Sequence, residues 1–450
     1  MIRRLHANRK RLQELLAPVR RGIWGLFDNG LISATNFLTM VLLARVLSIE
    51  AFGKFTLAYS VLLFFNSAQS ALVIQPHTVQ GAVRSGDEYR QYTSATAVLQ
   101  TGFAAIAAAL VAIGAMVCRV MDWSFDSLLF ALVPAVIAWQ CQEFVRRAMY
   151  TRLNAFGAFL NDLLSYGGQL VGVALLWQLE LLNPESAILV LALTSFLGTL
   201  LGAWQIRGHF ATILPRQKLH ETFQLNWQFG KWLLGGNLAA RASEALYPIF
   251  AAGIIGLAAP GALKAVQTLL GPTNVWVNAL EPTFAPRVAR IYSTQGTAAL
   301  RAFVLKLQIG IAICMGTYAV IVSALATQLL ERIYGPEYAT YGWLLAVVSM
   351  SYTLAALRIP FVMGLEAMNR TGSVFGAYLL AAIVNLTFGI GAIALFGIKG
   401  LGAGILLYMG TVAVSLWVQY SRATGRPLAP VIARAAHTRL HTAEQAGVDR

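Results

Sequence analysis

The sequence predicts an all-α integral membrane protein of about twelve transmembrane helices, arranged in two six-helix lobes related by a parallel pseudo-two-fold axis. The first observation is composition, because the chain is 57% hydrophobic and only 12% charged, with a mean hydropathy of +0.63. A soluble protein carries about twice that share of charge. The other two observations are the alternation of basic residues along the chain and an internal repeat.

Twelve apolar stretches are long enough to cross a bilayer, since a transmembrane helix needs about 20 mainly apolar residues. They lie at residues 22–47, 53–78, 93–118, 127–150, 155–179, 186–206, 229–253, 258–283, 301–325, 341–365, 374–396 and 400–421.

The basic residues orient these spans. If the N-terminus is inside, the inner segments hold most of the Arg and Lys, and the outer loops hold only Lys54, Arg119, Arg332 and Lys399. This is the distribution that the positive-inside rule requires, so both termini are predicted to be cytoplasmic. The net charge of +15 is therefore an orientation signal, and it does not indicate a nucleic-acid partner.

The spans divide the chain into two lobes and three polar segments. The predicted parts are a basic N-terminal segment at 1–21, an N-lobe at 22–207, a cytoplasmic inter-lobe loop at 208–228, a C-lobe at 229–422 and a cytoplasmic tail at 423–450. The basic segment suits an amphipathic helix lying on an anionic leaflet, and a disordered basic leader is the alternative.

An internal repeat supports the division. A shift of 208 residues places the first two spans on the seventh and eighth without a gap. The matched pairs that chance explains least are Gly22 with Gly230, Trp24 with Trp232, Asn29 with Asn237, Gly53 with Gly261, and Asn66 with Asn274. Six spans per lobe give both halves the same orientation, which predicts a substrate site between the lobes.

The seventh span carries a polar stripe. Asn237, Arg241 and Glu244 are spaced so that they lie on one helix face, and their counterparts in the first span include Asn29 and Asn36. Ionised side chains at membrane depth usually face protein or water. The stripe therefore predicts the wall of an aqueous cavity, and the alternative is an Arg–Glu pair that joins two helices.

Further polar residues extend this predicted cavity. The candidate substrate-binding cations are Arg241, Lys264 and Arg358, and the candidate groups for coupling to H⁺ or Na⁺ are Asp28 and Glu244; Asn274 and Asn278 follow one face of span eight. The cations outnumber the acids, which favours a phosphate-bearing ligand. Pro248, Pro272 and Pro360 predict bends in the helices that line the cavity.

Sequence patterns for catalysis are missing. No GxxxxGK[ST] occurs, the six histidines and three cysteines form no metal-ligand pattern, and no large outer loop carries paired carboxylates. We therefore expect no enzyme activity, no metal site and no cofactor apart from a coupling ion. Glu143, Arg146 and Arg147 at the end of span four are expected to form a charge cluster on the inner surface.

Two short motifs resemble a known family. The segment LLARVLSIEAFGKFTLAYS (42–60) is similar to the stretch joining the first two helices of bacterial polysaccharide flippases, and ERIYGPEYATYGWLLAV (331–347) resembles the start of their tenth helix. These Wzx-type flippases belong to the multidrug/oligosaccharidyl-lipid/polysaccharide (MOP) exporter superfamily. Its fold, shared with the MATE transporters, has twelve helices in two lobes.

The resemblance implies movement of an undecaprenyl-diphosphate-linked oligosaccharide across the bacterial inner membrane, with a polymerase and a chain-length regulator as protein partners. Three alternatives remain open. A MATE-like antiporter would use Asp28 and Glu244 to bind Na⁺ or H⁺. A lipid II flippase would have extra helices and a more cationic cavity, and a membrane enzyme of the same pathway would have a large outer loop.

Overall fold

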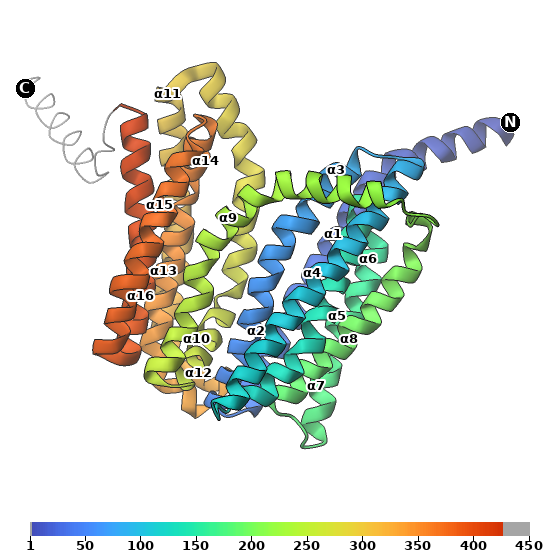
Figure 1. The fold of residues 1–450 in the computed structure, drawn as a ribbon. Coiled ribbons are helices and arrows are strands. Elements are labelled where there is room, and N and C mark those ends of the chain that lie inside the picture. The colour runs from blue at the N-terminus through green and yellow to red at the C-terminus, as the bar shows by residue number, and fades with distance from the viewer. Residues whose placement is uncertain (1, 426–450) are drawn as a thin grey trace, which may run out of the picture.

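The computed structural model describes the backbone of residues 2–425, and the side chains of that range except 2–22, 232, 236–246, 275, 278, 279, 281 and 282. The described chain is helical (Figure 1). The N-lobe comprises α1 (Ile2–Val46), α2 (Ile49–Gln69), η1 (Ser70–Ile74), α3 (Gln75–Ala82), α4 (Gly86–Val120), α5 (Asp126–Thr151), α6 (Ala155–Asp162), η2 (Leu163–Gly167), α7 (Gly168–Gln178) and α8 (Pro184–Gln205).

The second half of the chain follows a short 3₁₀ turn, η3 (Arg207–His209). It comprises α9 (Arg216–Ile255), α10 (Ala258–Leu269), α11 (Gly271–Ala324), α12 (Ala326–Tyr334), η4 (Pro336–Tyr341), α13 (Gly342–Leu357), α14 (Ile359–Ala367), α15 (Thr371–Val384), η5 (Asn385–Gly389) and α16 (Ile390–Ala423). We call the elements of this set from residue 229 of α9 onward the C-lobe.

All twelve predicted spans lie on helices. Nine stretches of the described chain are by themselves long and apolar enough to cross a membrane, and one of these, Thr371–Ala423, contains two predicted spans. Gly397 lies between those two spans and has a φ of 58°, so the chain reverses there. The remaining two predicted spans lie on α9 and on α10 with the start of α11.

Two of the three prolines expected to bend helices lie where helices break. Pro272 lies in the first turn of α11, directly after α10 ends, and Pro360 lies in the first turn of α14, after α13 ends. A proline is tolerated in a first turn because its missing N–H has no partner there anyway. Pro248, in contrast, lies inside the continuous helix α9.

Backbone irregularities recur at corresponding places in the two lobes. The fifth predicted span contains the π-helical turn η2, and the eleventh contains the π-helical turn η5. Residues with positive φ also pair by position: Gly86 with Gly296, Leu153 with Asn369, and Glu180 with Gly397. The same connections therefore turn in the same way in each lobe, as a parallel repeat predicts.

The lobes meet through a reciprocal contact between α2 and α10. A Cβ added at Gly53 would overlap the carbonyl oxygen of Leu257, and one added at Gly261 would overlap that of Ile49. Ile49 and Leu257 are themselves separated by the repeat offset of 208 residues. Gly53 of the first lobe thus contacts Leu257 of the second, and Gly261, the counterpart of Gly53, contacts Ile49, the counterpart of Leu257. Such a reciprocal pair of contacts is typical of two units related by a two-fold axis.

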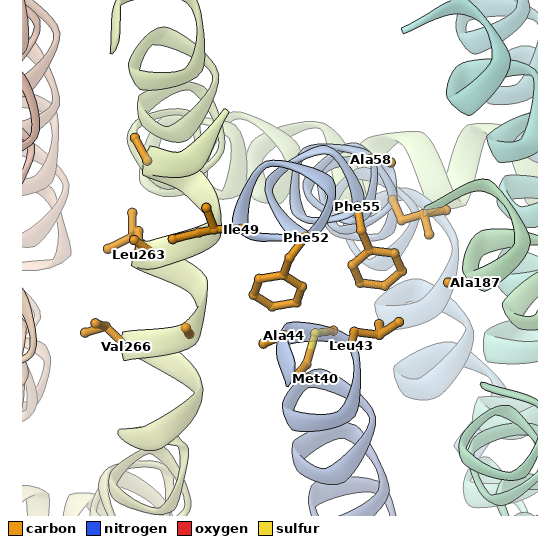
Figure 2. Close-up of a cluster of buried hydrophobic side chains, with 14 of the residues drawn as sticks. Met40, Leu43, Ala44, Ile49, Phe52, Phe55, Ala58, Ala187, Leu263 and Val266 are labelled. Atoms are coloured by element: carbon orange, nitrogen blue, oxygen red, sulfur yellow. The ribbon is translucent and has the colours of Figure 1, made fainter. Parts of the chain in front are cut away.

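We call this contact between α2 and α10 the seam. A continuous apolar core surrounds it. Met40, Leu43 and Phe52 of the N-lobe pack in the same cluster as Leu263 and Val266 of α10, as Figure 2 shows. The seam lies where α1 passes into α2 and α9 into α10, which the positive-inside rule places outside. Figure 1 shows the two helix groups converging at this end and diverging toward the end that carries α3 and the first half of α9.

The connection between the lobes is largely helical. The predicted loop 208–228 is helix from Arg216 onward, because α9 continues without interruption into the membrane. Its first half is held on the N-lobe, where the Tyr92 hydroxyl donates to Asn226 at 2.9 Å and Gly230 packs directly on the backbone of Ala71. One helix thus spans both lobes.

Candidate functional site

A buried ionic network lies inside the N-lobe, where α1, α5 and α6 meet. Arg146 on α5 is its centre, with Nε 2.5 Å from Asp162 Oδ2, Nη1 3.1 Å from Glu143 Oε2 and Nη2 3.4 Å from Asp28 Oδ2. The side chains of Asp28 and Asp162 have no exposed surface, and Arg146 is 7% exposed. The Tyr150 hydroxyl also donates to Asp28.

The local sequence explains how the network is assembled. Asn154 caps the start of α6 by accepting a hydrogen bond from the Gly157 amide. The short helix α6 follows, and Asp162 lies directly before the π-helical turn η2. Such turns insert one residue into a helix and are frequent at functional sites. In this protein the insertion places Asn161 and Asp162 together toward α5, where both accept hydrogen bonds from Gln142.

Small residues on α8 allow this close approach. Asn161 donates to the carbonyl oxygen of Gly198, and a Cβ at Gly198 would lie 3.1 Å from the Gln142 side chain. A Cβ at Gly202 would overlap Val145. The two glycines therefore let α8 cover the network without displacing it.

The charges of this network do not cancel. Three carboxylates, those of Asp28, Glu143 and Asp162, face the guanidinium of Arg146, and the more exposed Arg147 lies 2.6 Å from Glu143. If all groups are ionised, the cluster carries one excess negative charge. Asp28 Oδ1 is also buried and has no hydrogen-bond partner among the described residues. A single bound cation would neutralise the excess charge of the cluster.

One sequence-based expectation about these residues is wrong. Glu143 and Arg146 do not form a cluster on the inner surface, because both are only 7% exposed and point into the helix bundle. Only Arg147 is exposed. The expectation failed because the partner carboxylates on α1 and α6 are distant in sequence. Asp162 was missed, although it is the only acidic residue in span five and an ionisable residue at membrane depth is a functional candidate by default.

Lys264 lies at the seam between the lobes. Its side chain is half-buried on α10, and Nζ lies 5.3 Å from the centre of the Tyr59 ring on α2. The Tyr59 ring stacks on Phe55 and lies against Trp139. Among the described residues no carboxylate pairs with Lys264, so its charge is balanced only by the face of an aromatic ring.

The other predicted cavity residues are dispersed. Arg358 lies within the C-lobe, where its guanidinium is 5.1 Å from the Tyr378 ring centre. Asn29 and Asn274 are exposed and Asn36 is half-buried, and the Asn29 amide donates to the carbonyl of Gly25 in its own helix. The side chains of Asn237, Arg241, Glu244 and Asn278 lie outside the described residues.

The connection before α9 carries a histidine packed among arginines. His209 lies edge-on to the Tyr89 ring at 5.7 Å, and Arg152 lies over that ring at 3.4 Å. Partial burial, together with the positive charges of Arg152 and Arg90, lowers the pKa of His209 below its usual value. The contact of His209 with the Tyr89 ring attaches the connection to the N-lobe, and the lowered pKa favours the neutral imidazole. In the described residues no group of three His, Cys, Asp or Glu side chains could hold a metal ion.

Comparisons by sequence and by structure give different results. No protein-family model matches the sequence, and no curated protein matches it either. Solved structures do match, among them an inward-facing multidrug resistance MATE transporter of the MOP superfamily, with a TM-score of 0.71, 11% identity and coverage of 89% of this chain and 98% of that one. The lipid II flippase MurJ in an inward closed conformation gives a TM-score of 0.67 at 13% identity, covering 88% of this chain and 87% of that one.

An outward-facing MATE transporter of the MOP superfamily gives a TM-score of only 0.57, at 11% identity and with coverage of 91% of this chain and 95% of that one. All these neighbours are transporters or flippases. This chain is a multi-pass membrane protein with the fold of the MOP superfamily transporters.

Proposed function

We propose that this chain is a flippase that moves an undecaprenyl-diphosphate-linked oligosaccharide across the bacterial inner membrane by alternating access. The product would feed an O-antigen, exopolysaccharide or capsule polymer, with a polymerase and a chain-length regulator as partners. The chain would be multi-pass in the inner membrane, with both termini cytoplasmic. The fold and the motifs at 42–60 and 331–347 support this class of transporter.

The observation that carries the proposal is Lys264 at the seam. An amine at membrane depth that faces the partner lobe, with no carboxylate partner among the described residues, is costly unless an anion joins it during function. Opening the seam on the outside would separate Lys264 from Tyr59. The amine would then be available to the diphosphate as the lobes rock, while the polyprenyl chain stays in lipid. A site that changes its partners between two states can bias the equilibrium between them.

Flipping in vesicles tests this proposal. Lys264→Ala should lower the rate of flipping of a fluorescent undecaprenyl-diphosphate oligosaccharide at least tenfold, and Lys264→Arg should retain most of it, because the positive charge remains. Arg241→Ala should cause a similar loss. The matched control is Lys54→Ala, since Lys54 lies 5.9 Å from the Phe125 ring at the same end of the molecule but within the N-lobe. Normal flipping by a well-folded Lys264→Ala, Arg241→Ala double variant would refute the proposal.

A second candidate function, a cation-coupled antiporter of small molecules, is favoured by the buried ionic network. The excess negative charge around Arg146, beside an Asp28 oxygen that has no hydrogen-bond partner among the described residues, suits a cluster that binds and releases a cation. A proton gradient across vesicles separates the two functions. An antiporter would exchange an organic cation for protons and would not flip the lipid-linked oligosaccharide.

The network can also couple a flippase to protons. Asp28→Asn removes one carboxylate and with it the excess negative charge of the network, so flipping by this variant should no longer respond to a pH gradient although the protein folds. If wild-type flipping ignores both pH and sodium gradients, the network has no coupling role and the membrane potential would be the remaining driving force.

A further inference from the structure

A long groove runs along the flank of the C-lobe, between α15 and the second half of α16. It has a volume of about 1050 Å³ and is lined by Arg370 and Ser373 at the start of α15 and by residues from Ala403 to Arg422 on α16. This groove lies apart from the seam and from the N-lobe network.

One end of the groove is cationic. Arg370 directly precedes α15 and Arg422 lies in the last turn of α16, so both are at the end that the positive-inside rule places in the cytoplasm. Both side chains are exposed, and in the described part of the chain neither guanidinium has a hydrogen-bond or ion-pair partner. Ser373 and Gln419 add hydroxyl and amide groups beside them. Two guanidinium groups at one site match two phosphate groups well.

The rest of the groove is mainly apolar and long. Leu380, Leu407, Val414 and Val418 line it, and Gly410 widens it because nothing lies within 4 Å of the place of its Cβ. From Ala403 to Arg422 the helix rises about 28 Å at 1.5 Å per residue. The whole hydrocarbon core is about 30 Å thick, so one leaflet is about 15 Å. The groove is therefore longer than the acyl chain of a phospholipid in one leaflet.

We propose that this groove binds a polyprenyl diphosphate lipid, with the diphosphate between Arg370 and Arg422 and the single long chain along α16. Two cations and a track that crosses most of the membrane fit this lipid better than a phospholipid with one phosphate and short chains. The inference deepens the proposed function, on which it rests, by giving the lipid substrate a docking site on the membrane side of the C-lobe. The substrate would be held there before its headgroup enters between the lobes.

Binding to the purified full-length protein tests the cationic end. The probes are undecaprenyl diphosphate and, as a competing lipid, phosphatidylglycerol. Arg370→Gln combined with Arg422→Gln should raise the Kd for undecaprenyl diphosphate at least tenfold and leave weak phosphatidylglycerol binding unchanged. If wild-type protein binds phosphatidylglycerol as tightly as undecaprenyl diphosphate, and both are lost together, the groove is a phospholipid site and the proposal is overturned.

A second variant tests the apolar track without touching the arginines. Gly410→Trp should fill the groove midway, where there is open space for the first side-chain atom. It should weaken undecaprenyl diphosphate at least tenfold and farnesyl diphosphate, whose short chain stays near the arginines, less than twofold. Gly102→Trp on α4 is the matched control, because Gly102 is an exposed glycine of the other lobe with equally open space. Equal affinities of all variants for the long-chain probe would overturn the proposal.

Truncation of the chain and a flipping assay complete the test. A chain ending at Gly425 should bind undecaprenyl diphosphate as the full chain does; if it binds much more tightly, the C-terminal segment occupies the groove and the proposal fails. Flipping is measured separately on the same variants. If both groove variants bind the probe normally and flip it at the wild-type rate, the groove proposal alone is overturned. If the groove binds the probe but the wild-type protein flips no substrate, the proposed function is overturned.

Discussion

At the scale of single residues, the centre of the N-lobe is one arginine shared by three carboxylates. Arg146 contacts Asp28, Glu143 and Asp162. Tyr150 donates to the same Asp28 oxygen that Arg146 contacts, and Gln142 donates to the other oxygen of Asp162. Burying these ions costs desolvation free energy, so the complete network adds little to the stability of the fold. Removing one member is nevertheless strongly destabilising, because it leaves a buried charge without its partner. The residues that hold it come from three helices.

Replacing the shared arginine should therefore destabilise the N-lobe. Arg146→Gln leaves three buried carboxylates without their common partner, and we expect a loss of about 3–5 kcal/mol in folding free energy, as for other broken buried pairs. Thermal unfolding in detergent measures this loss. Adding Asp162→Asn should restore much of it, because one uncompensated charge is removed. A double variant no more stable than Arg146→Gln alone would contradict the charge argument.

At the scale of elements, two features recur in both lobes: a π-helical turn and a close glycine contact. The turns η2 and η5 lie in corresponding spans, and each contains or adjoins a buried Asn or Asp, namely Asp162 and Asn385. Gly53 and Gly261 allow α2 and α10 to approach within backbone contact. Neither lobe could reach this distance with a larger residue at either position.

A side chain at the seam should thus open the outer end. Gly261→Val overlaps the carbonyl of Ile49, and we expect the closed state to be destabilised by at least about 1–3 kcal/mol through overpacking. Hydrogen exchange at the start of α2 should rise and transport should fall. Gly114→Val is the control, because nothing lies within 4 Å of that position. Unchanged hydrogen exchange in Gly261→Val would contradict the prediction, because the lobes could then move apart at the seam without destabilising the start of α2.

At the scale of the whole molecule, the lobes pack on each other at one end and are connected by a helix at the other. The apolar cluster that joins them includes Phe52 and Val266 at the seam, and α9 spans both lobes at the opposite end (Figure 1). Because α9 belongs to both bodies, any rocking of the lobes must bend it between Gly230, which is fixed on the N-lobe, and Tyr247, which is buried in the C-lobe.

Chemical labelling can test whether the outer end is closed at rest. Ala262 is fully buried at the seam, and Glu50 is exposed at the same end of the molecule. In a cysteine-free background, Ala262→Cys should react with an impermeant maleimide at least tenfold more slowly than Glu50→Cys. Its reactivity should rise during transport, when the lobes part on the outside. Equal rates without substrate would mean that the seam is open in the resting protein.

Much of the architecture could be predicted from the order of residues. The positions of the spans follow from hydropathy, because a helix that crosses a bilayer needs about 20 mainly apolar residues. Their orientation stays a prediction from the positions of Arg and Lys. The repeat is visible as matched Trp, Asn and Gly residues at one offset, and Gly53 and Gly261, which form the seam, are one of the matched pairs. Asp28 and Lys264 were predicted as polar positions because ions are rare at membrane depth.

The partners of those ions were decided by tertiary structure alone. Asp28 lies inside one lobe with Arg146 and Asp162, whereas Lys264 lies against Tyr59 of the opposite lobe. Hydropathy cannot distinguish these cases, because it records how costly an ion is and not which helix supplies its partner. The sequence by itself determined the spans and the repeat, and it predicts the orientation of the spans. Only the packing of the helices decided which charges are shared within a lobe and which lie where the lobes meet.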